Sequence, residues 1–211
     1  AVKSVLAVIN FKTTETENFF EDVNENDEYC PYINSALSMG IVSASNEFRP
    51  DDYITVAEFY AMILRALGYG EYASAVAAYP AGVLKAAARI GLDDDAALNG
   101  NDLINRNSAL HIIYNALMSS VMEETSISSK GAAYDFGGDK ETVLEKYFNM
   151  ELFSGIVTAN NATTLNDLVS GAAGSIAVGD KTYNDLTASA YGAIGKNICY
   201  LVDSDNDNNI I

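Results

Sequence analysis

Two short polar motifs stand where helices are expected to begin. Thr55 and Glu58 have the T-x-x-E spacing of a capping box. In that motif the hydroxyl accepts an N–H of the first turn and the carboxylate reaches back to the cap residue. Asn105 and Arg106 open the next expected helix. A guanidinium presents paired donors that match both oxygens of a carboxylate, and a helix N-terminus beside it adds partial positive charge. The chemistry expected of these residues is therefore helix capping and anion binding.

Other reactive residues lack the partners that catalysis or metal binding requires. His111 is the single histidine, and no Ser or Cys stands at a recognisable catalytic spacing from it. The acidic run from Asp203 to Asp207 matches the first half of an EF-hand loop, but Asn208 replaces the glycine that such a loop needs. We expect a solvated hairpin turn there, and we expect Cys30 and Cys199 to be free, buried thiols. The sequence predicts no catalytic residues, no metal site and no cofactor.

A strongly amphipathic helix is expected to follow Thr55. Its apolar residues recur at the spacing of one helical face, and Gly68 can end the helix in a left-handed conformation. The residues on that face are Phe59, Met62, Ile63, Ala66 and Leu67.

The same arrangement recurs further along the chain. The segment 104–109 lies 50 positions after 54–59, and its apolar face follows at the same spacing. Upstream of each segment lies another expected helix, which ends at Gly40 in the first case and at Gly91 in the second. An internal period of about 50 residues with two helices in each unit is typical of a repeat architecture.

Composition excludes some classes of partner. The chain has 211 residues, a formal net charge of −17 and an isoelectric point near 4.1. Nucleic acid phosphates require clustered Lys and Arg, so we expect no nucleic acid partner. No apolar run reaches the length of a membrane span, so no span is expected either.

These motifs together resemble the S-layer homology (SLH) family. The first unit carries FEDV at 20–23, FRPDDYITVAEF at 48–59 and RALGY at 65–69. The second carries YPAGVLKAAARIGL at 79–92 and LINRNSALHIIYNAL at 103–117, which are similar to a later repeat of the family. The resemblance covers roughly residues 1–120.

The resemblance implies a fold, a partner and a location. Members attach exported proteins of Gram-positive-type bacteria to a cell-wall polysaccharide, and three repeats usually pack as a pseudo-threefold helical prism. Sugar sites lie in grooves between repeats, near helix starts of sequence T-R-A-E. The Arg of that motif meets an anionic sugar, typically a pyruvylated one. The residues that the resemblance implies as ligands are Arg106, Asn105, Gly40, Gly91, Asp22, Thr55 and Glu58.

The sequence also departs from the family pattern. Val56 stands where the first repeat would carry the Arg, so Thr55 and Glu58 are expected mainly to cap their helix. Gly40 and Gly91 have an equally good reading as helix C-caps that need a positive φ. The array is either degenerate or completed by residues outside this sequence.

After residue 150 the periodicity becomes strand-like, with an expected hairpin about Gly179 and Asp180. This half resembles the small β domain that often follows SLH repeats in gut clostridial surface proteins. The expected domains are a partial repeat helix and linker at 1–19, repeats at 20–70 and 71–120, a connector at 121–149 and a small β domain at 150–211.

The sequence thus predicts an α+β protein with an α-helical SLH-like repeat array followed by a small all-β domain. The expected function is non-catalytic attachment to the cell wall through an anionic secondary cell-wall polysaccharide, outside the cell in the wall or S-layer. The alternative is a degenerate SLH scaffold that contacts other surface proteins during surface-layer assembly. An enzyme is the weakest of the three readings.

Overall fold

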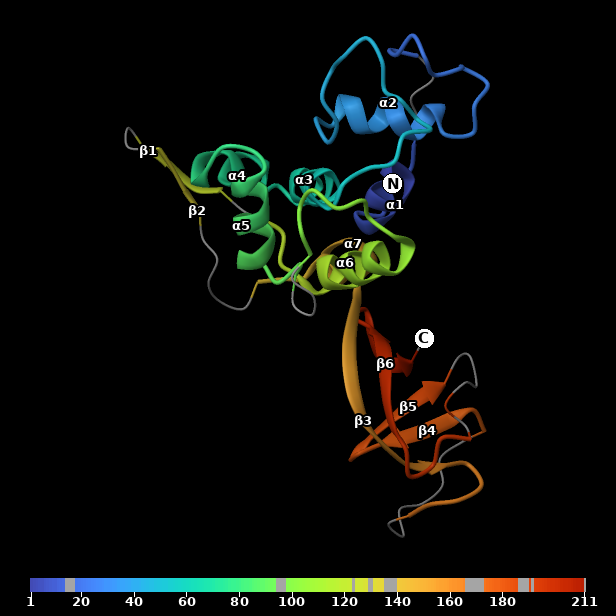
Figure 1. Ribbon diagram of the computed structural model, residues 1–211. Helices are drawn as coiled ribbons and strands as arrows, with labels where there is room; N and C mark the ends of the chain where they lie inside the picture. The colour runs from blue at the N-terminus through green and yellow to red at the C-terminus, as the bar shows by residue number, and fades with distance from the viewer. Residues whose placement is uncertain are drawn as a thin grey trace. The chain divides into compact units, whose positions relative to one another are not determined.

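A computed structural model of the 211-residue chain divides into two compact units, Ala1–Val143 and Leu144–Ile211 (Figure 1). The structure describes residues 1–13, 18–93, 98–122, 124–128, 131–134, 140–165, 173–185, 190 and 192–210.

The first unit is mainly helical and contains two helix pairs in repeat order. The first helix of each pair is α2 or α5, and the second is α3 or α6. The elements of this unit are α1 (Val2–Val8), α2 (Cys30–Ser38), α3 (Val56–Ala66), α4 (Gly70–Val76), α5 (Ala81–Arg89), α6 (Arg106–Met118), β1 (Glu124–Ser128) and β2 (Gly131–Tyr134).

Helix α3 is the centre of this unit. Eight of its eleven residues are buried, because α1, α4, α5 and α6 all pack against it. The side chains of Phe59, Tyr60, Ile63 and Leu64 are at most 1% exposed. Burial of so large an apolar face is the main driving force for folding of the unit.

Helices α1, α3 and α6 contact one another pairwise, while α2 packs on α1 and α5 packs on α3. The end of α1 repeats the end of α3. Asn10 (φ 50°) and Gly68 (φ 85°) are both left-handed, and the next residue in each case donates its N–H back into the helix, as in Phe11 to Leu6 O at 3.0 Å and Tyr69 to Leu64 O at 2.7 Å. The two helices therefore end with the same C-cap geometry.

Two segments differ from the sequence-based expectation. No helix is predicted from the sequence within residues 70–78, but this segment contains α4, which packs closely on α5. The connector at 121–149 contains the antiparallel hairpin of β1 and β2. Neither segment carries a periodic apolar face of its own, so its structure depends on tertiary packing or on strand pairing rather than on a local signal.

The second unit contains a small closed β barrel of five strands. Its strands close in the order β3-β4-β5-β7-β6, with β5 and β7 parallel. Its elements are α7 (Val143–Phe148, which begins at the last residue of the first unit), β3 (Met150–Asn160), β4 (Ser175–Val178), β5 (Lys181–Asp185), β6 (Asn197–Asp203) and β7 (Asn206–Ile210). The core side chains include Val157, Ile176, Tyr183, Tyr200 and Val202.

Details of the barrel confirm two expected hairpins and correct one expectation. The β4–β5 hairpin turns at Gly179, which has φ 58°. The acidic run from Asp203 to Asp207 contains the β6–β7 hairpin turn, at Ser204 and Asp205, and β7 already begins at Asn206. Both cysteines are free as expected, but Cys199 is exposed and only Cys30 is buried. Among the described residues, no helix is both long enough and apolar enough to cross a bilayer.

Candidate functional site

The start of α3 forms a complete capping box. The Thr55 hydroxyl accepts the Glu58 N–H at 3.3 Å, and the Glu58 carboxylate accepts the Thr55 N–H at 2.8 Å. The two remaining N–H groups of the first turn donate to a loop of the second repeat: Val56 to Asp102 O at 2.9 Å and Ala57 to Gly100 O at 3.0 Å. Every N–H group at the start of α3 therefore has an acceptor within the chain.

The start of α6 is different. The helix begins at Arg106, where the repeat pattern placed it, and the Asn105 side chain accepts the Ser108 N–H at 2.9 Å. Among the described residues, the N–H groups of Arg106 and Asn107 reach no acceptor. The Arg106 side chain is exposed and forms no ion pair within the same described ranges. Two backbone donors and one guanidinium are thus available at one helix start.

The segments that precede α3 and α6 pair with each other. Thr55 and Leu103 form an antiparallel bridge. The Ile104 N–H donates to Ile54 O at 3.0 Å, and the bond from Val56 to Asp102 O completes the bridge. Each helix cap is extended, with ψ near 165°, as this pairing requires (Thr55 ψ 163°, Asn105 ψ 166°). The pairing brings the two helix starts to neighbouring positions.

Asp22 holds the loop between α2 and α3. Its carboxylate accepts the N–H groups of Phe48 at 2.8 Å and Arg49 at 2.6 Å. The hydrogen bond from Phe48 is the main cause that holds the pKa of Asp22 below its ordinary value. The Phe20 and Phe48 rings pack edge to face beside it, with centroids 5.4 Å apart. The visible role of Asp22 is to fix this loop.

Gly40 and Gly91 end α2 and α5 in the left-handed region, with φ of 70° and 75°. In each case the following residue donates its N–H back into the helix, from Ile41 to Ala36 O at 2.8 Å and from Leu92 to Ala87 O at 2.9 Å. The geometry shows helix C-caps, as the second reading of these glycines predicted.

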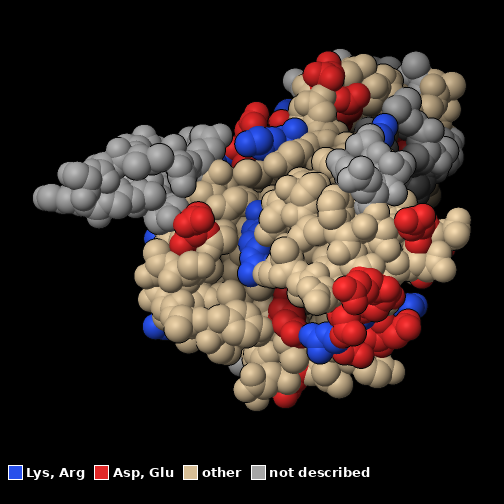
Figure 2. Space-filling model, turned by 90° about the horizontal axis from the view of Figure 1, so that it is seen from above, with Lys and Arg blue, Asp and Glu red and all other residues tan. Residues whose placement is uncertain are grey.

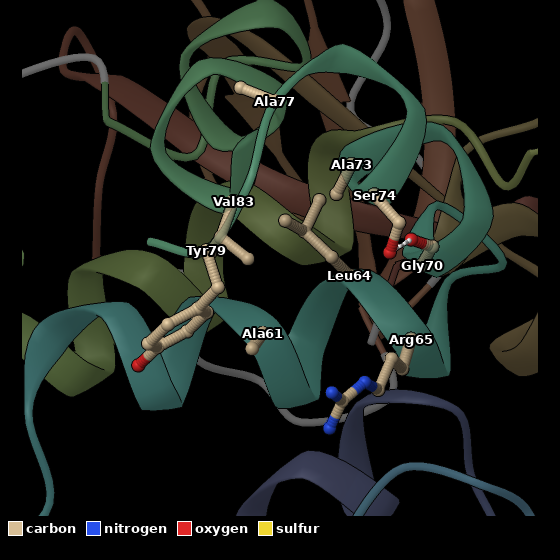
Figure 3. A pocket seen from close by; sticks show the side chains of 9 residues that line it. All are labelled: Ala61, Leu64, Arg65, Gly70, Ala73, Ser74, Ala77, Tyr79 and Val83. Carbon is tan, nitrogen blue, oxygen red and sulfur yellow. Dashed lines mark hydrogen bonds between the residues drawn. The ribbon is translucent and has the colours of Figure 1, made fainter. Parts of the chain in front are cut away.

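A cavity that the sequence did not indicate lies between α3, α4 and α5 (Figure 3). Its volume is about 90 Å³, and none of the predicted site residues lines it. Its walls are mostly small and apolar, and the one guanidinium at its edge, that of Arg65, donates to Ile41 O at 3.0 Å. No sequence signal could have shown the cavity, because its wall α4 was itself missed.

Charge on the surface is unevenly distributed. On the face drawn in Figure 2, Asp and Glu side chains gather in groups, some with Lys or Arg beside them, on a surface that is otherwise largely uncharged. Ion pairs among the described residues include Lys3 with Glu28 at 2.8 Å and Arg49 with Asp52 at 3.4 Å. The same residues include no group of three or more His, Cys, Asp or Glu placed to hold a metal ion.

Comparison with known proteins identifies the module that contains α2 and the start of α3. The family model of the S-layer homology domain matches residues 19–59, a range that includes Asp22, Thr55 and Glu58. No curated protein and no solved structure matches the chain. Residues 19–59 of this chain are thus similar to the S-layer homology domain, and modules of that family bind the cell wall at the cell surface and are not catalytic.

Proposed function

We propose that this protein attaches non-catalytically to the cell wall of a Gram-positive, clostridial-type bacterium by binding an anionic secondary cell-wall polysaccharide at the start of α6. The single observation that carries the proposal is the contrast between the two repeats. The N–H groups that open α3 are used within the chain, whereas those of Arg106 and Asn107 reach no acceptor among the described residues.

The chemistry of this helix start suits a carboxylate on a sugar, such as that of a pyruvyl acetal. The guanidinium of Arg106 can donate to both carboxylate oxygens, and the backbone N–H groups beside it point along the helix axis toward the same anion. Asn105 caps the helix and sets the position of this turn. Because the site is exposed, each contact is modest in energy and firm attachment requires several sites along the polymer.

The remaining predicted ligand residues frame the site in this proposal. Thr55 and Glu58 fix the start of α3, Asp22 fixes the loop before it, and Gly40 and Gly91 end the first helices of the two repeats. We further propose that α1, α3 and α6 are the inner helices of a pseudo-threefold prism. The pairwise contacts of these three helices, with α2 on α1 and α5 on α3, support that arrangement.

Co-sedimentation with purified, protein-free cell-wall sacculi tests the proposal. The wild type is expected to sediment with the sacculi, and Arg106→Ala is expected to weaken binding by about tenfold, since a hydrogen bond to a charged group contributes roughly 1.5–3 kcal/mol. Arg106→Lys should bind at an intermediate level because it keeps the charge but loses the paired donors. Lys196→Ala removes the same charge from the barrel and serves as the matched control.

Chemical removal of the wall polysaccharide should abolish binding of the wild type. Failure of the wild type to bind intact sacculi would contradict the proposal. That result would favour the alternative of a degenerate scaffold that contacts other surface proteins. The barrel offers exposed apolar side chains for such contacts, including Ile156, which is 52% exposed.

A further inference from the structure

Three side chains at the start of α2 surround an ammonium group of the chain itself. The Lys3 ammonium, on α1, donates to the Glu28 carboxylate at 2.8 Å. It also lies over two aromatic rings, 5.1 Å from the ring centroid of Tyr32 and 5.8 Å from that of Tyr29. An aromatic ring attracts a cation that lies over its face within about 6 Å. One carboxylate and two rings therefore hold the same nitrogen atom.

We propose that Glu28, Tyr29 and Tyr32 form an exchangeable cage for a lysine side chain. Lys3 fills the cage within the chain, and a lysine of a basic partner polypeptide takes its place when the partner binds. The class of ligand follows from the occupant, which is a primary ammonium at the end of a methylene stem. This cage goes beyond attachment to the wall and shares no residue with the site at Arg106.

The contact that Lys3 makes is of a kind that exchanges easily. The Lys3 side chain is 47% exposed and that of Glu28 is 69% exposed, and exposed ion pairs add little to stability. A released lysine also regains the rotamer freedom that the contact had cost. Helix α1 is held by its buried side chains, which include Val5 and Leu6. Release of Lys3 therefore leaves α1 in place and opens the cage to solvent.

The chemistry of the cage favours a primary ammonium over other cations. A quaternary ammonium satisfies the two rings but has no N–H to donate to Glu28. The hydrogen bond between Lys3 and Glu28 is the main cause that raises the pKa of Lys3 and lowers the pKa of Glu28. The cage thus stabilises the charged form of the amine that it holds.

Charge around the cage indicates a basic partner. Residues 20–29 contain five carboxylates and no Lys or Arg, and the whole chain carries −17. A surface of this sign raises the rate of encounter with a positively charged partner. The start of α2 contributes a partial positive charge of about half an elementary charge, which the full charge of Glu28 outweighs.

An NMR titration of the isotope-labelled protein with the peptide acetyl-Gly-Lys-Gly-amide tests the exchange. The peptide should shift the amide signals of Tyr29 and Tyr32. Lys3→Ala is expected to bind it about tenfold more tightly than the wild type, the gain for a cage that Lys3 fills nine-tenths of the time. Lys12→Ala removes the same charge from an exposed position and should bind like the wild type. Equal affinities of Lys3→Ala and the wild type would overturn the proposal, because a purely structural contact gives no gain.

Further variants in the Lys3→Ala protein test the walls of the cage. Tyr32→Ala is expected to weaken binding about fivefold, as for loss of one cation–π contact, and Glu28→Gln should weaken it as well. Tyr79→Ala, at a tyrosine that is 60% exposed, is the matched control and should have no effect. If Tyr32→Ala lowers the melting temperature, Tyr29→Ala replaces it, since that ring is 52% exposed. A loss no greater than that of Tyr79→Ala would contradict the cage.

Changes in the probe test the class of ligand. Norleucine in place of the peptide lysine removes the charge and should abolish binding, and trimethyl-lysine, which lacks the N–H, should bind more weakly than lysine. Tighter binding of a chitosan trimer than of the lysine peptide would assign the cage to an amino sugar and overturn the choice of a polypeptide partner. Because these probes are soluble and need no sacculi, failure here leaves the attachment proposal standing, and failure of attachment leaves the cage standing.

Discussion

Asp22 shows how one carboxylate can fix a loop through its hydrogen bonds to the backbone. It accepts the N–H groups of Phe48 and Arg49, two donors from the far end of the loop that joins α2 to α3. A carboxylate that accepts backbone N–H groups is stabilised in its charged form, which accounts for its lowered pKa. The family resemblance implies Asp22 as a ligand residue, and the hydrogen bonds within the chain describe a structural clamp.

We expect Asp22→Ala to lower the melting temperature of the protein at neutral pH. Because the folded-state pKa is lowered, the stabilisation is complete above the ordinary pKa of aspartate, about 3.9, and is lost as pH falls through the lowered folded value. Thermal unfolding followed by circular dichroism from neutral to acidic pH should show the two proteins converging at the acid end. Asp51→Ala, a change at an exposed aspartate of the same loop, is the control. A difference between Asp22→Ala and wild type that is constant across the titration would contradict the clamp.

Some of the site residues were predictable because their roles are local. The capping box of Thr55 and Glu58 depends on four consecutive residues, and the start of α6 at Arg106 depends on the adjacent Asn105 cap. The bridge between Thr55 and Leu103 was not predictable. It depends on a pairing between segments 50 positions apart, and no local pattern records which residue of one segment faces which of the other.

Among the elements, the close contact of α4 with α5 depends on one glycine. A Cβ atom at Gly82 would lie closer to the carbonyl oxygens of Ala73 and Ala77 than real Cβ atoms approach such atoms. These oxygens belong to the backbone and cannot rotate away as a side chain could. The absence of a side chain at Gly82 is therefore what lets the end of α4 lie against the first turn of α5.

Gly82→Ala is expected to destabilise the first unit by about 1–3 kcal/mol, the usual range for overpacking, although alanine is the better helix former. Urea denaturation should show a lower midpoint for this variant. Gly192→Ala is the control, since a Cβ there meets nothing within 4 Å. A Gly82→Ala protein as stable as the wild type would mean that α4 does not pack on α5 in this way.

Elements with a periodic apolar face were predicted well and the others were not. Helix α3 could be predicted from its own sequence, since its apolar face and its N-terminal capping box both indicate the same helix. Helix α4 buries only Ala73 among its residues, so there was no face to find. Strand β7 reads as a polar turn because its residues are mostly Asn and Asp, and it becomes a strand through pairing with β6 and β5.

At the scale of the whole molecule, the negative net charge of the protein opposes its binding to the proposed partner, an anionic polysaccharide. The chain carries −17, and an anionic polymer would be repelled at long range while Arg106 attracts it at short range. Salt separates the long-range repulsion from the short-range attraction, because the Debye length falls from about 30 Å at 0.01 M salt to about 8 Å at 0.15 M. The long-range repulsion is therefore screened first.

We therefore expect association with sacculi to be faster at about 0.15 M salt than at about 0.01 M, since salt screens the long-range repulsion first. Affinity should then decline toward 1 M salt as the contact to Arg106 is screened as well. Time-resolved sedimentation or turbidity across these salt concentrations measures both quantities. Arg106→Ala should keep the first effect and lose the second. A continuous decrease in rate from the lowest salt upward would contradict this account.

The pairing of Ile54 with Ile104 makes the two repeats unequal partners. These residues occupy equivalent places in the repeats, but the contact between them is one-sided. The N–H of Ile104 donates to Ile54 O and the N–H of Val56 donates to Asp102 O, whereas the N–H of Arg106, the counterpart of Val56, reaches no acceptor among the described residues. Because the hydrogen bonds are not returned by the equivalent groups, the two segments are not interchangeable, and each copy of the repeat is suited to its own place in the chain.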